Sequence, residues 1–340
     1  MIGYRSVIAI SAATIFTAAA HAQSVEPFYK GKVVSVYVGS SAGGANDLYT
    51  RLLAKHMGRY LDGNPTLVVR NMPGAGSRKL ASYIFSAALS DGTEFGLVDR
   101  NIFTEWLLLS DKTNLVDPRS LTWIGSPSQE TLTCVSWRNS SVQSLDDLKT
   151  KPFMIGSTGA MSGESLAANI LNATIGARVK TVIGYPGGAE MNLAMQRGET
   201  DGRCGLGWGA IKAGYQRWIE QGDMKVLIQT ALESHPEITD IPVLGSLVKD
   251  NSLKQALTLL LADQRIGRPI IAPPKISANR KAELQVAFDK TIRDPEFLKD
   301  ANAGNMEIRP VGAPYIMSLL KSIFELPEST VMMARKIANY

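Results

Sequence analysis

The chain has 340 residues, of which 45% are hydrophobic, and it carries a formal net charge of +5. This length and apolar content favour two domains with sizeable cores over one domain. The basic residues are scattered, without a Lys/Arg block or interleaved aromatic residues, which argues against nucleic-acid binding. A mild positive balance suits an anionic ligand without demonstrating one.

The N-terminus has the pattern of a secretory signal peptide. Arg5 is the only charge before the apolar run 7–20, and Ala20-His21-Ala22 matches an A-x-A cleavage site. We therefore expect residues 1–22 to be removed by cleavage after Ala22. The run is too short for a membrane span, and no later stretch reaches the ~18 apolar residues that a span needs. Without a lipobox-like Cys at the cleavage point, the mature chain is expected to be free in the periplasm.

The stretch 33–58 predicts a strand, a tight turn and a helix. Residues 33–38 are rich in β-branched side chains, residues 39–44 are all small, and Asn46 and Asp47 stand at the start of a helical pattern. Residues 68–88 repeat this plan, with a strand at 68–71, a turn at 72–77 and a helix at 80–88. A loop without bulk lets an anion approach backbone N–H groups at the positive end of a helix. Two such loops at adjacent strand ends suggest capture of a small acid.

Strands and helices alternate along most of the remaining chain, which favours an α/β protein with largely parallel sheets. The segment 126–130 is expected to cross between domains, and the strand 224–229 to return to the first domain. Further strands are expected at 95–98, 121–125, 132–137, 153–156, 179–183, 201–206 and 224–229. Further helices are expected at 102–109, 145–149, 164–174, 189–197, 278–293, 295–301, 314–324 and 329–338.

Two more small-residue loops, 157–163 and 184–188, follow strands of the expected second domain. Any one such loop is explained by the positive φ that short connections need. Four loops in matching positions, two on each side of a domain boundary, favour a ligand site, because open α/β sheets bind ligands at the carboxyl ends of their strands.

An enzyme is the main alternative from the residues. Residues 39–43 spell G-x-S-x-G, the pattern of a nucleophile elbow, so a secreted serine hydrolase would use Ser41. It would need a histidine, and His235 alone follows in the usual order, while His56 lies on the helix after the loop. The P-loop Lys and the dinucleotide fingerprint are absent, so no cofactor is expected. Helix starts and solvated turns explain the nearby acidic residues without catalysis: Glu164, Glu190, Glu199 and Asp201.

The two cysteines, Cys134 and Cys204, each lie in a predicted strand. In an oxidising compartment an even pair is expected to form a disulfide, the alternative being two separately buried thiols. No metal site is expected, because His56 and His235 are the histidines that survive cleavage and neither has zinc-ligand spacing to a cysteine.

The order of motifs in the mature chain resembles the periplasmic receptors of tripartite tricarboxylate transporters, the Bug family. The resemblance rests on SSAGGAND, VVRNMPGAGS, SDGT, IGSTGAMSGES and GYPGGAEMNLAMQRGETDGR. It implies an α/β, two-domain periplasmic binding protein of type II, with the ligand cleft between the domains. Domain 1 would comprise residues 23–128 plus 231–340, and domain 2 residues 129–230.

The resemblance also implies a set of ligand-binding residues from the four loops. Carried onto matching positions, they are Ser41, Ala42, Gly43, Asp47, Gly74, Ala75, Gly76, Ser157, Thr158, Gly159, Tyr185, Gly187, Gly188 and Asp201. The sequence departs from the family pattern at Ser41-Ala42, at Glu164-Ser165, at Arg203-Cys204 and at Trp208, which leaves the ligand identity open. Arg100 and Arg203 are candidate charge partners of a ligand. Tyr185 and Trp208 could stack on an aromatic acid or pack between the domains.

The sequence therefore predicts a periplasmic solute receptor, not an enzyme, which closes on a small organic carboxylate. Its partners would be that ligand and the membrane permease subunits of a tripartite tricarboxylate transporter, and it is expected to be a monomer. Two alternatives stay open: a receptor for a non-carboxylate solute that serves another permease or a sensor, and the serine hydrolase using Ser41.

Overall fold

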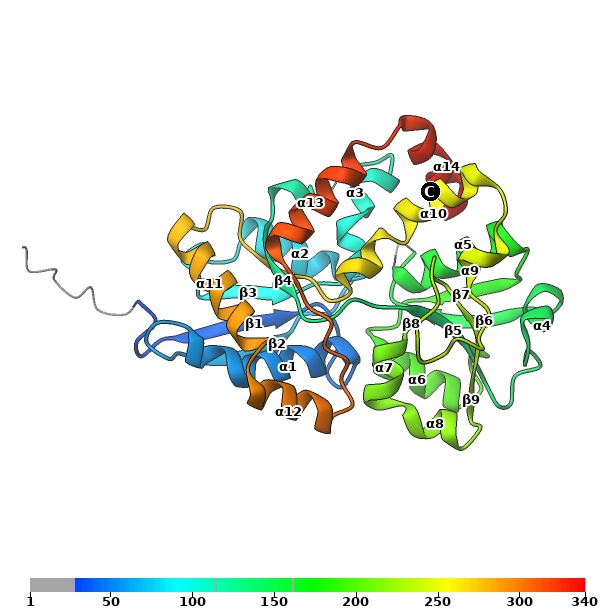
Figure 1. Ribbon diagram of the computed structural model, residues 1–340, viewed down its shortest axis with the longest axis horizontal. Helices are drawn as coiled ribbons and strands as arrows, with labels where there is room; N and C mark the ends of the chain where they lie inside the picture. The colour runs from blue at the N-terminus through cyan, green and yellow to red at the C-terminus, as the bar shows by residue number, and fades with distance from the viewer. Residues whose placement is uncertain (1–27, 114, 161, 340) are drawn as a thin grey trace, which may run out of the picture.

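The computed structural model describes residues 28–113, 115–160 and 162–339. The predicted signal peptide and the first residues of the mature chain lie outside these ranges. Figure 1 shows two lobes side by side, each built from a sheet with helices packed on it. The predicted α/β class is confirmed. Within the described ranges, no helix has the length and apolar character needed to cross a bilayer.

The first lobe is built on a sheet that has six strands among the described residues, in the order β11-β4-β10-β3-β1-β2. Strand β1 pairs in parallel with both β2 and β3, whereas β10 runs antiparallel to β3 and β4. Parallel pairing places the carboxyl ends of β1, β2 and β3 at one edge. The strands are β1 (Val33–Val38), β2 (Thr66–Asn71), β3 (Glu94–Leu97), β4 (Thr122–Ser126), β10 (Ile270–Ala272) and β11 (Val311–Gly312).

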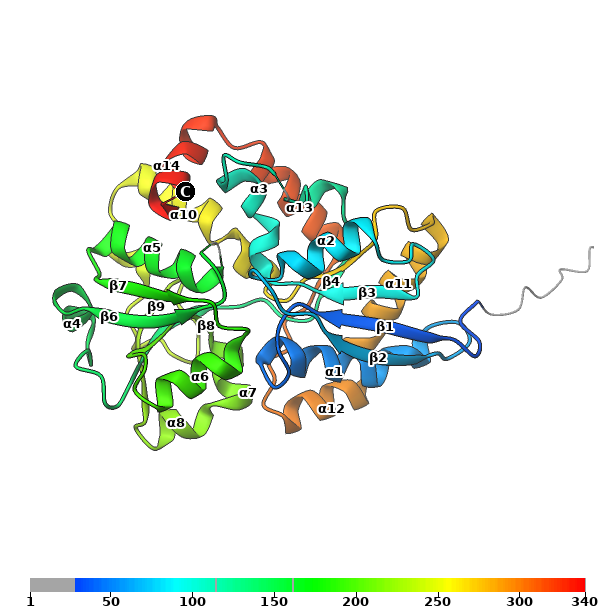
Figure 2. The ribbon, with the colours of Figure 1, turned by 180° about the vertical axis from the view of Figure 1, so that it is seen from behind.

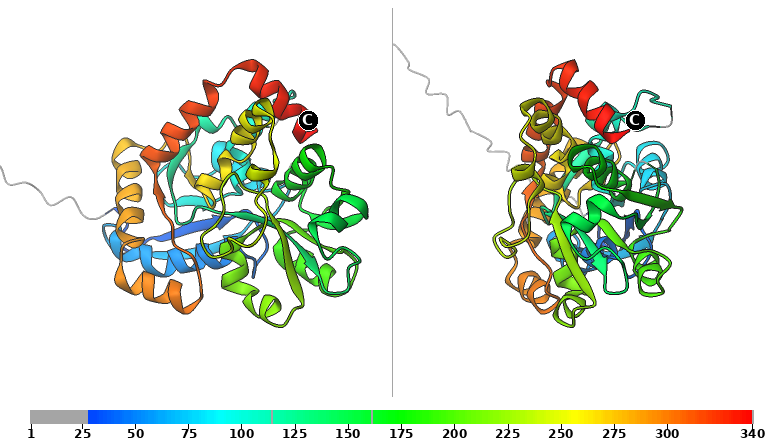
Figure 3. Two further views of the ribbon diagram at one scale, coloured as in Figure 1. Left: turned by 45° about the vertical axis from the view of Figure 1, so that its right-hand side comes forward. Right: turned by 90° about the vertical axis from the view of Figure 1, so that its right-hand side faces the viewer.

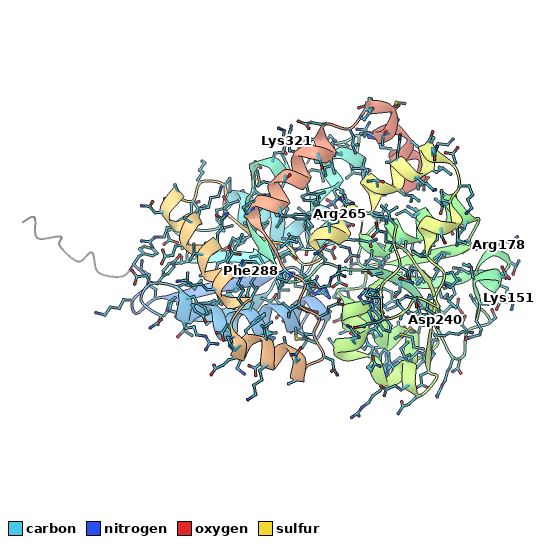
Figure 4. The ribbon with its side chains drawn as sticks, viewed as in Figure 1. Lys151, Arg178, Asp240, Arg265, Phe288 and Lys321 are labelled. Atoms are coloured by element: carbon cyan, nitrogen blue, oxygen red, sulfur yellow. A yellow bond between two sulfur atoms is a disulfide. The ribbon has the colours of Figure 1, made fainter. Side chains whose placement is uncertain are left out.

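An apolar core holds the helices of the first lobe on this sheet. Val36, Phe95 and Leu53 are buried in one cluster with Phe288, which Figure 4 labels, and Phe288 lies against Gly125 so closely that a methyl group there would overlap its ring. The helical elements are α1 (Ala45–Met57), η1 (Gly58–Tyr60), α2 (Arg78–Ser86), η2 (Arg100–Phe103), α3 (Glu105–Leu108), η3 (Pro118–Ser120), α11 (Ala278–Thr291), α12 (Pro295–Ala303) and α13 (Ala313–Phe324).

The second lobe is built on a five-stranded sheet, counted over the described ranges, in the order β7-β6-β8-β5-β9. Strands β7, β6 and β8 are parallel, and β5 runs antiparallel to β8 and β9. We expected β9 to return to the first domain, but its hydrogen bonds to β5 make it an edge strand of this sheet. The strands are β5 (Leu132–Trp137), β6 (Phe153–Ser157), β7 (Val179–Ile183), β8 (Gly202–Gly207) and β9 (Met224–Gln229), and the helices are α4 (Leu145–Thr150), α5 (Gly163–Ile175), α6 (Gly188–Gln196), α7 (Trp208–Gly214) and α8 (Gln216–Glu220).

The predicted disulfide is confirmed. The antiparallel register of β5 and β8 places Cys134 opposite Cys204, and the two buried residues are joined. The bridge therefore connects neighbouring strands of one sheet rather than the two lobes.

The chain passes from the first sheet to the second after β4 and returns after β9. The return path contains α9 (Leu244–Leu247), α10 (Asn251–Leu260) and η4 (Ala262–Ile266), and the chain ends with α14 (Glu328–Ala338). Helix α14, red in Figure 3, lies beside α10 and also contacts α3 and α5. It thus joins the lobes a third time. The domain limits drawn from the sequence stay a prediction.

Candidate functional site

A cavity of about 100 Å³ lies between the two lobes. Its lining includes Gly39 and Gly76 from the first lobe and Thr158 and Gly188 from the second. Figure 2 shows why these segments meet: the carboxyl end of β1 points toward the second lobe, and α1 and α6 lie on opposite sides of the junction. The volume is sufficient for several water molecules or a small organic ligand.

The first loop brings the N-terminus of α1 to the cavity. Its N-cap, Gly44, makes no side-chain capping bond, and Gly44, Ala45 and Asn46 line the cavity. The loop is shaped from behind by buried Asp47, which accepts hydrogen bonds from Gly43 N and from Arg51 Nε, both at 2.9 Å. Burial acts to raise the pKa of Asp47, but the bonds from its neighbours outweigh burial and lower it. An uncapped helix start of this kind leaves backbone N–H groups for a ligand.

The second loop is held in a left-handed backbone conformation. The φ angles are +148° at Gly74, +47° at Ala75, +61° at Gly76 and +70° at Ser77. Ser77 precedes α2 without a side-chain capping bond, and its hydroxyl donates to Gly39 O at 3.0 Å, which ties the two loops together. The N-terminus of α2 therefore lies beside the cavity, but its first N–H groups, on Arg78 and Lys79, already donate to Ala75 O and Gly74 O within the turn, at 3.3 and 3.5 Å.

The second lobe contributes another open helix start. The turn after β7 places Tyr185, Gly187 and Gly188 in the lining, and α6 begins there with no side-chain cap on Gly187. Arg203 of β8 donates to Asn192 Oδ1 at 2.7 Å and to Gly188 O at 3.4 Å. A guanidinium group thus stands next to the positive end of α6.

Further charged side chains line the cavity. Asp99 and Arg100 follow β3, Glu164 lies in the first turn of α5, and Glu130 forms a buried ion pair with Arg268. Arg100 Nη2 donates to Gly205 O of the second lobe at 3.3 Å, so this side chain spans the cleft.

The cavity brings together part of the predicted ligand-binding set and leaves the rest outside its lining. The predicted residues that line it are Gly74, Ala75, Gly76, Thr158, Tyr185, Gly187 and Gly188. Those outside it are Ser41, Ala42, Gly43, Asp47, Ser157, Gly159 and Asp201. Of the candidates for charge or stacking, Arg100 and Arg203 line the cavity, whereas Trp208 does not and donates to Glu237 at 2.7 Å.

The predicted residues outside the lining have other contacts. Ser41 donates to Glu190 Oε2 across the cleft at 2.8 Å, Ser157 bonds to Ser162 and Ser165, and Asp201 accepts from Met154 N at 2.7 Å. Ala42 and Gly43 belong to the first loop, and Gly159 lies close to the second loop at Ala75 and Gly76.

Sequence reasoning did not find Asp99, Glu130 or Arg268. Asp99 lies two residues after the end of β3, so the rule that ligands bind at strand carboxyl ends would have found it. Arg268 precedes β10, a strand of three residues that was not expected. No sequence signal indicates that Glu130 and Arg268 meet.

The hydrolase alternative finds no support in the contacts. The Ser41 hydroxyl bonds to Glu190, His235 Nε2 lies 3.2 Å from Glu307, and His56 Nε2 lies 2.7 Å from Asp300. Within the described part of the chain, neither histidine contacts Ser41, and no cluster of three or more His, Cys, Asp or Glu side chains is placed to hold a metal ion.

Comparisons with solved structures identify the fold. The structure matches the periplasmic binding protein BugD with a TM-score of 0.71 and 18% identity, covering 91% of this chain and 98% of BugD. The chain has the fold of a periplasmic binding protein. A protein of R. palustris solved with adipate matches at TM-score 0.68 and 17% identity, covering 91% of this chain and 97% of that one. MatC from Rhodopseudomonas palustris, solved with malate, matches with a TM-score of 0.67 and 16% identity. The match covers 90% of this chain and 98% of MatC. No family model and no curated protein matches the sequence.

Proposed function

We propose that this protein is a periplasmic solute receptor of the tripartite tricarboxylate transporter type, a member of the Bug family. It captures a small organic carboxylate between its lobes and delivers it to the subunits of a membrane permease. The observation that carries this proposal is the convergence of the second loop and the open N-termini of α1 and α6 on one cavity with buried Arg203. Helix N-termini and guanidinium groups are the partners that a carboxylate prefers.

Independent observations support the same class of ligand. The neighbours of R. palustris hold adipate and malate, which are carboxylates. The order of the loop motifs along the chain resembles the Bug receptors, and the N-terminal pattern directs the chain to the periplasm.

The protein would bind its ligand through hydrogen bonds and domain closure and would not transform it in a chemical reaction. N–H groups and a guanidinium donate to the ligand oxygens inside a cleft from which water is largely excluded, where such bonds are stronger than in water. A ligand that touches both lobes favours the closed form through contacts that the open form lacks.

Mass spectrometry of ligand released from natively purified protein tests this function, together with a thermal-shift screen of organic acids, sugars and metal salts. We expect an organic acid in the released fraction and the largest thermal shifts from acids. Small-angle scattering with the best acid should show compaction. Preferred binding of sugars or metal cations would contradict the proposal, and so would tight acid binding without compaction.

The role in transport has a separate test in the source cells. Uptake of the identified acid should fall when the gene for this chain is removed and should recover on re-expression. Normal uptake without the receptor would contradict delivery to a permease.

A further inference from the structure

The charged side chains around the cavity fall into two groups. One group consists of Arg203 beside the N-terminus of α6. The other, the acidic group, consists of Asp99, Glu164 and Asp263 around Arg100. Glu130 and Arg268 form a mutual pair, so they neutralise each other.

Arg203 is a buried cation without an acidic partner. It is 5% exposed, its two hydrogen bonds go to the neutral acceptors Asn192 Oδ1 and Gly188 O, and its Nε has no hydrogen-bond partner. Among the described residues it makes no ion pair. A buried charge without a counter-charge is unfavourable in free energy, so this end of the cavity favours a negatively charged group of the ligand.

The acidic group has the opposite imbalance, with three carboxyl groups around a single guanidinium. Asp263 Oδ2 lies 3.6 Å from Arg100 Nε and does not belong to the cavity lining, whereas Asp99 and Glu164 line the cavity. Arg100 is also shared with Gly205 O. Burial raises the pKa of Asp99, and nearby Glu164 adds to the rise, while Arg100 opposes it.

We propose that the ligand is a zwitterion, a carboxylate that carries a protonated nitrogen in the same molecule. Its carboxylate lies against Arg203 and the N-terminus of α6, and its nitrogen donates to Asp99 and Glu164. This inference rests on the proposed function, whose carboxylate site it keeps, and narrows the substrate class. A dicarboxylate would instead bring a second negative charge to the acidic group, where like charges repel.

Calorimetry with matched ligands tests the proposal on the mature protein. Alanine, 4-aminobutanoate and 6-aminohexanoate would each be compared with the monocarboxylate and the dicarboxylate of the same carbon number. Because a hydrogen bond between charged groups is stronger than one between neutral groups, we expect the best amino acid to bind roughly tenfold tighter than both matched acids.

Two variants locate the two ends of the ligand. Glu164→Gln removes the charge but keeps an oxygen that can accept from Thr158 Oγ1, which donates to Glu164 at 3.3 Å. This variant should reduce the preference for the amino acid over its monocarboxylate by roughly fivefold or more. Arg203→Met should weaken every acid by roughly tenfold or more, while the ligand-free protein melts at or above the wild-type temperature because an unpaired buried cation is gone. Glu199→Gln, on an exposed side chain away from the cavity, is the matched control and should behave as wild type.

The outcomes separate this inference from the proposed function. If a dicarboxylate binds as tightly as the matched amino acid, or if Glu164→Gln leaves the preference for the amino acid over its monocarboxylate at the wild-type value, the zwitterion is wrong and the carboxylate receptor stands. If no carboxylate of either kind binds, the proposed function fails and the zwitterion fails with it.

Discussion

Gly187 lies where the two lobes touch, and the absence of a side chain there lets the N-terminus of α6 approach Ser41. A methyl group on Gly187 would overlap the Ser41 hydroxyl and lie 3.2 Å from Ser41 N. We expect Gly187→Ala to hold the lobes apart and to weaken ligand binding by roughly tenfold, because overpacking costs about 1–3 kcal/mol. Calorimetry with the best acid from the screen measures the effect.

The control for this prediction is Gly214→Ala, since a methyl group on Gly214 meets nothing within 4 Å. Adding Ser41→Gly to Gly187→Ala should restore part of the affinity by removing the hydroxyl that overlaps. Wild-type affinity in Gly187→Ala would show that the contact between Gly187 and Ser41 does not belong to the ligand-bound state.

Glu105 gives the protein a stability that depends on pH. Burial raises the pKa of Glu105 to about 7 and outweighs the opposing effect of Arg78, whose Nε lies 3.0 Å away. Because this pKa is raised above its unfolded value, the folded protein holds the proton more tightly than the unfolded chain does. The contribution is complete below the unfolded pKa of 4.5 and is lost as pH rises through about 7.

We therefore expect the unfolding free energy of the wild type to fall by about 1–3 kcal/mol from this residue between pH 5 and pH 8. Glu105→Gln cannot titrate and should show a flatter profile. Urea unfolding across this pH range measures both proteins, and identical slopes for the two would rule Glu105 out as the source.

Some residues of the cavity could be predicted from the sequence, and others could not. Three glycines that line the cavity were predicted, because a run of small residues after a strand is visible in the sequence: Gly76, Gly187 and Gly188. Asp201 was carried over on its position in a motif, but it accepts a backbone hydrogen bond from Met154 instead of lining the cavity. The pairing of Glu130 with Arg268 depends on a tertiary contact between distant segments, which no local pattern encodes.

At the scale of elements, four strands were predicted to the residue. Strands β1, β5, β7 and β9 have the predicted limits, because each is a run of mainly apolar or β-branched residues with turn residues close to its ends. Strand β10 was missed since three residues are too short to show a period. Helix α10 was missed although its buried residues follow helical spacing: Ala256, Leu257, Leu259 and Leu260.

The disulfide belongs to this scale because it joins strands β5 and β8. Cys134 and Cys204 are 70 residues apart, and closing a loop of that length is worth roughly 4 kcal/mol in the chain-entropy model. We expect thiol titration of denatured, unreduced protein to find no free thiol. The double variant Cys134→Ala/Cys204→Ala should lose about 2–4 kcal/mol of unfolding free energy in urea. Two titratable thiols in the untreated protein would show that the bridge does not form.

At the scale of the whole molecule, the resemblance of the loop motifs to the Bug family predicted two lobes with a cleft between them. The solved neighbours confirm this fold. The third connection was not foreseen. One apolar cluster includes Trp123 of the first lobe, Phe153 of the second, and Leu257 and Ala334 of α10 and α14. The proposed closure would have to occur around a core that α10 and α14 share between the lobes, which favours a small rotation over free movement.

Two hydrogen bonds cross the cleft. Ser41 bonds to Glu190 at 2.8 Å and Arg100 to Gly205 O at 3.3 Å, so the lobes meet around the cavity. Under the proposed function, the protein rather than water would match the polar groups of a ligand in the cavity. Replacing a carboxylate by an amide leaves donors unmatched, which costs about 1–3 kcal/mol.

The affinity of the best carboxylate compared with that of its primary amide, measured by calorimetry under one set of conditions, tests the central claim most directly. The account predicts that the acid binds roughly tenfold tighter or more, since about 1.4 kcal/mol is a factor of ten. Equal affinity for the acid and the amide would contradict it, because Arg203 and the open helix N-termini would then not recognise the charge of the ligand.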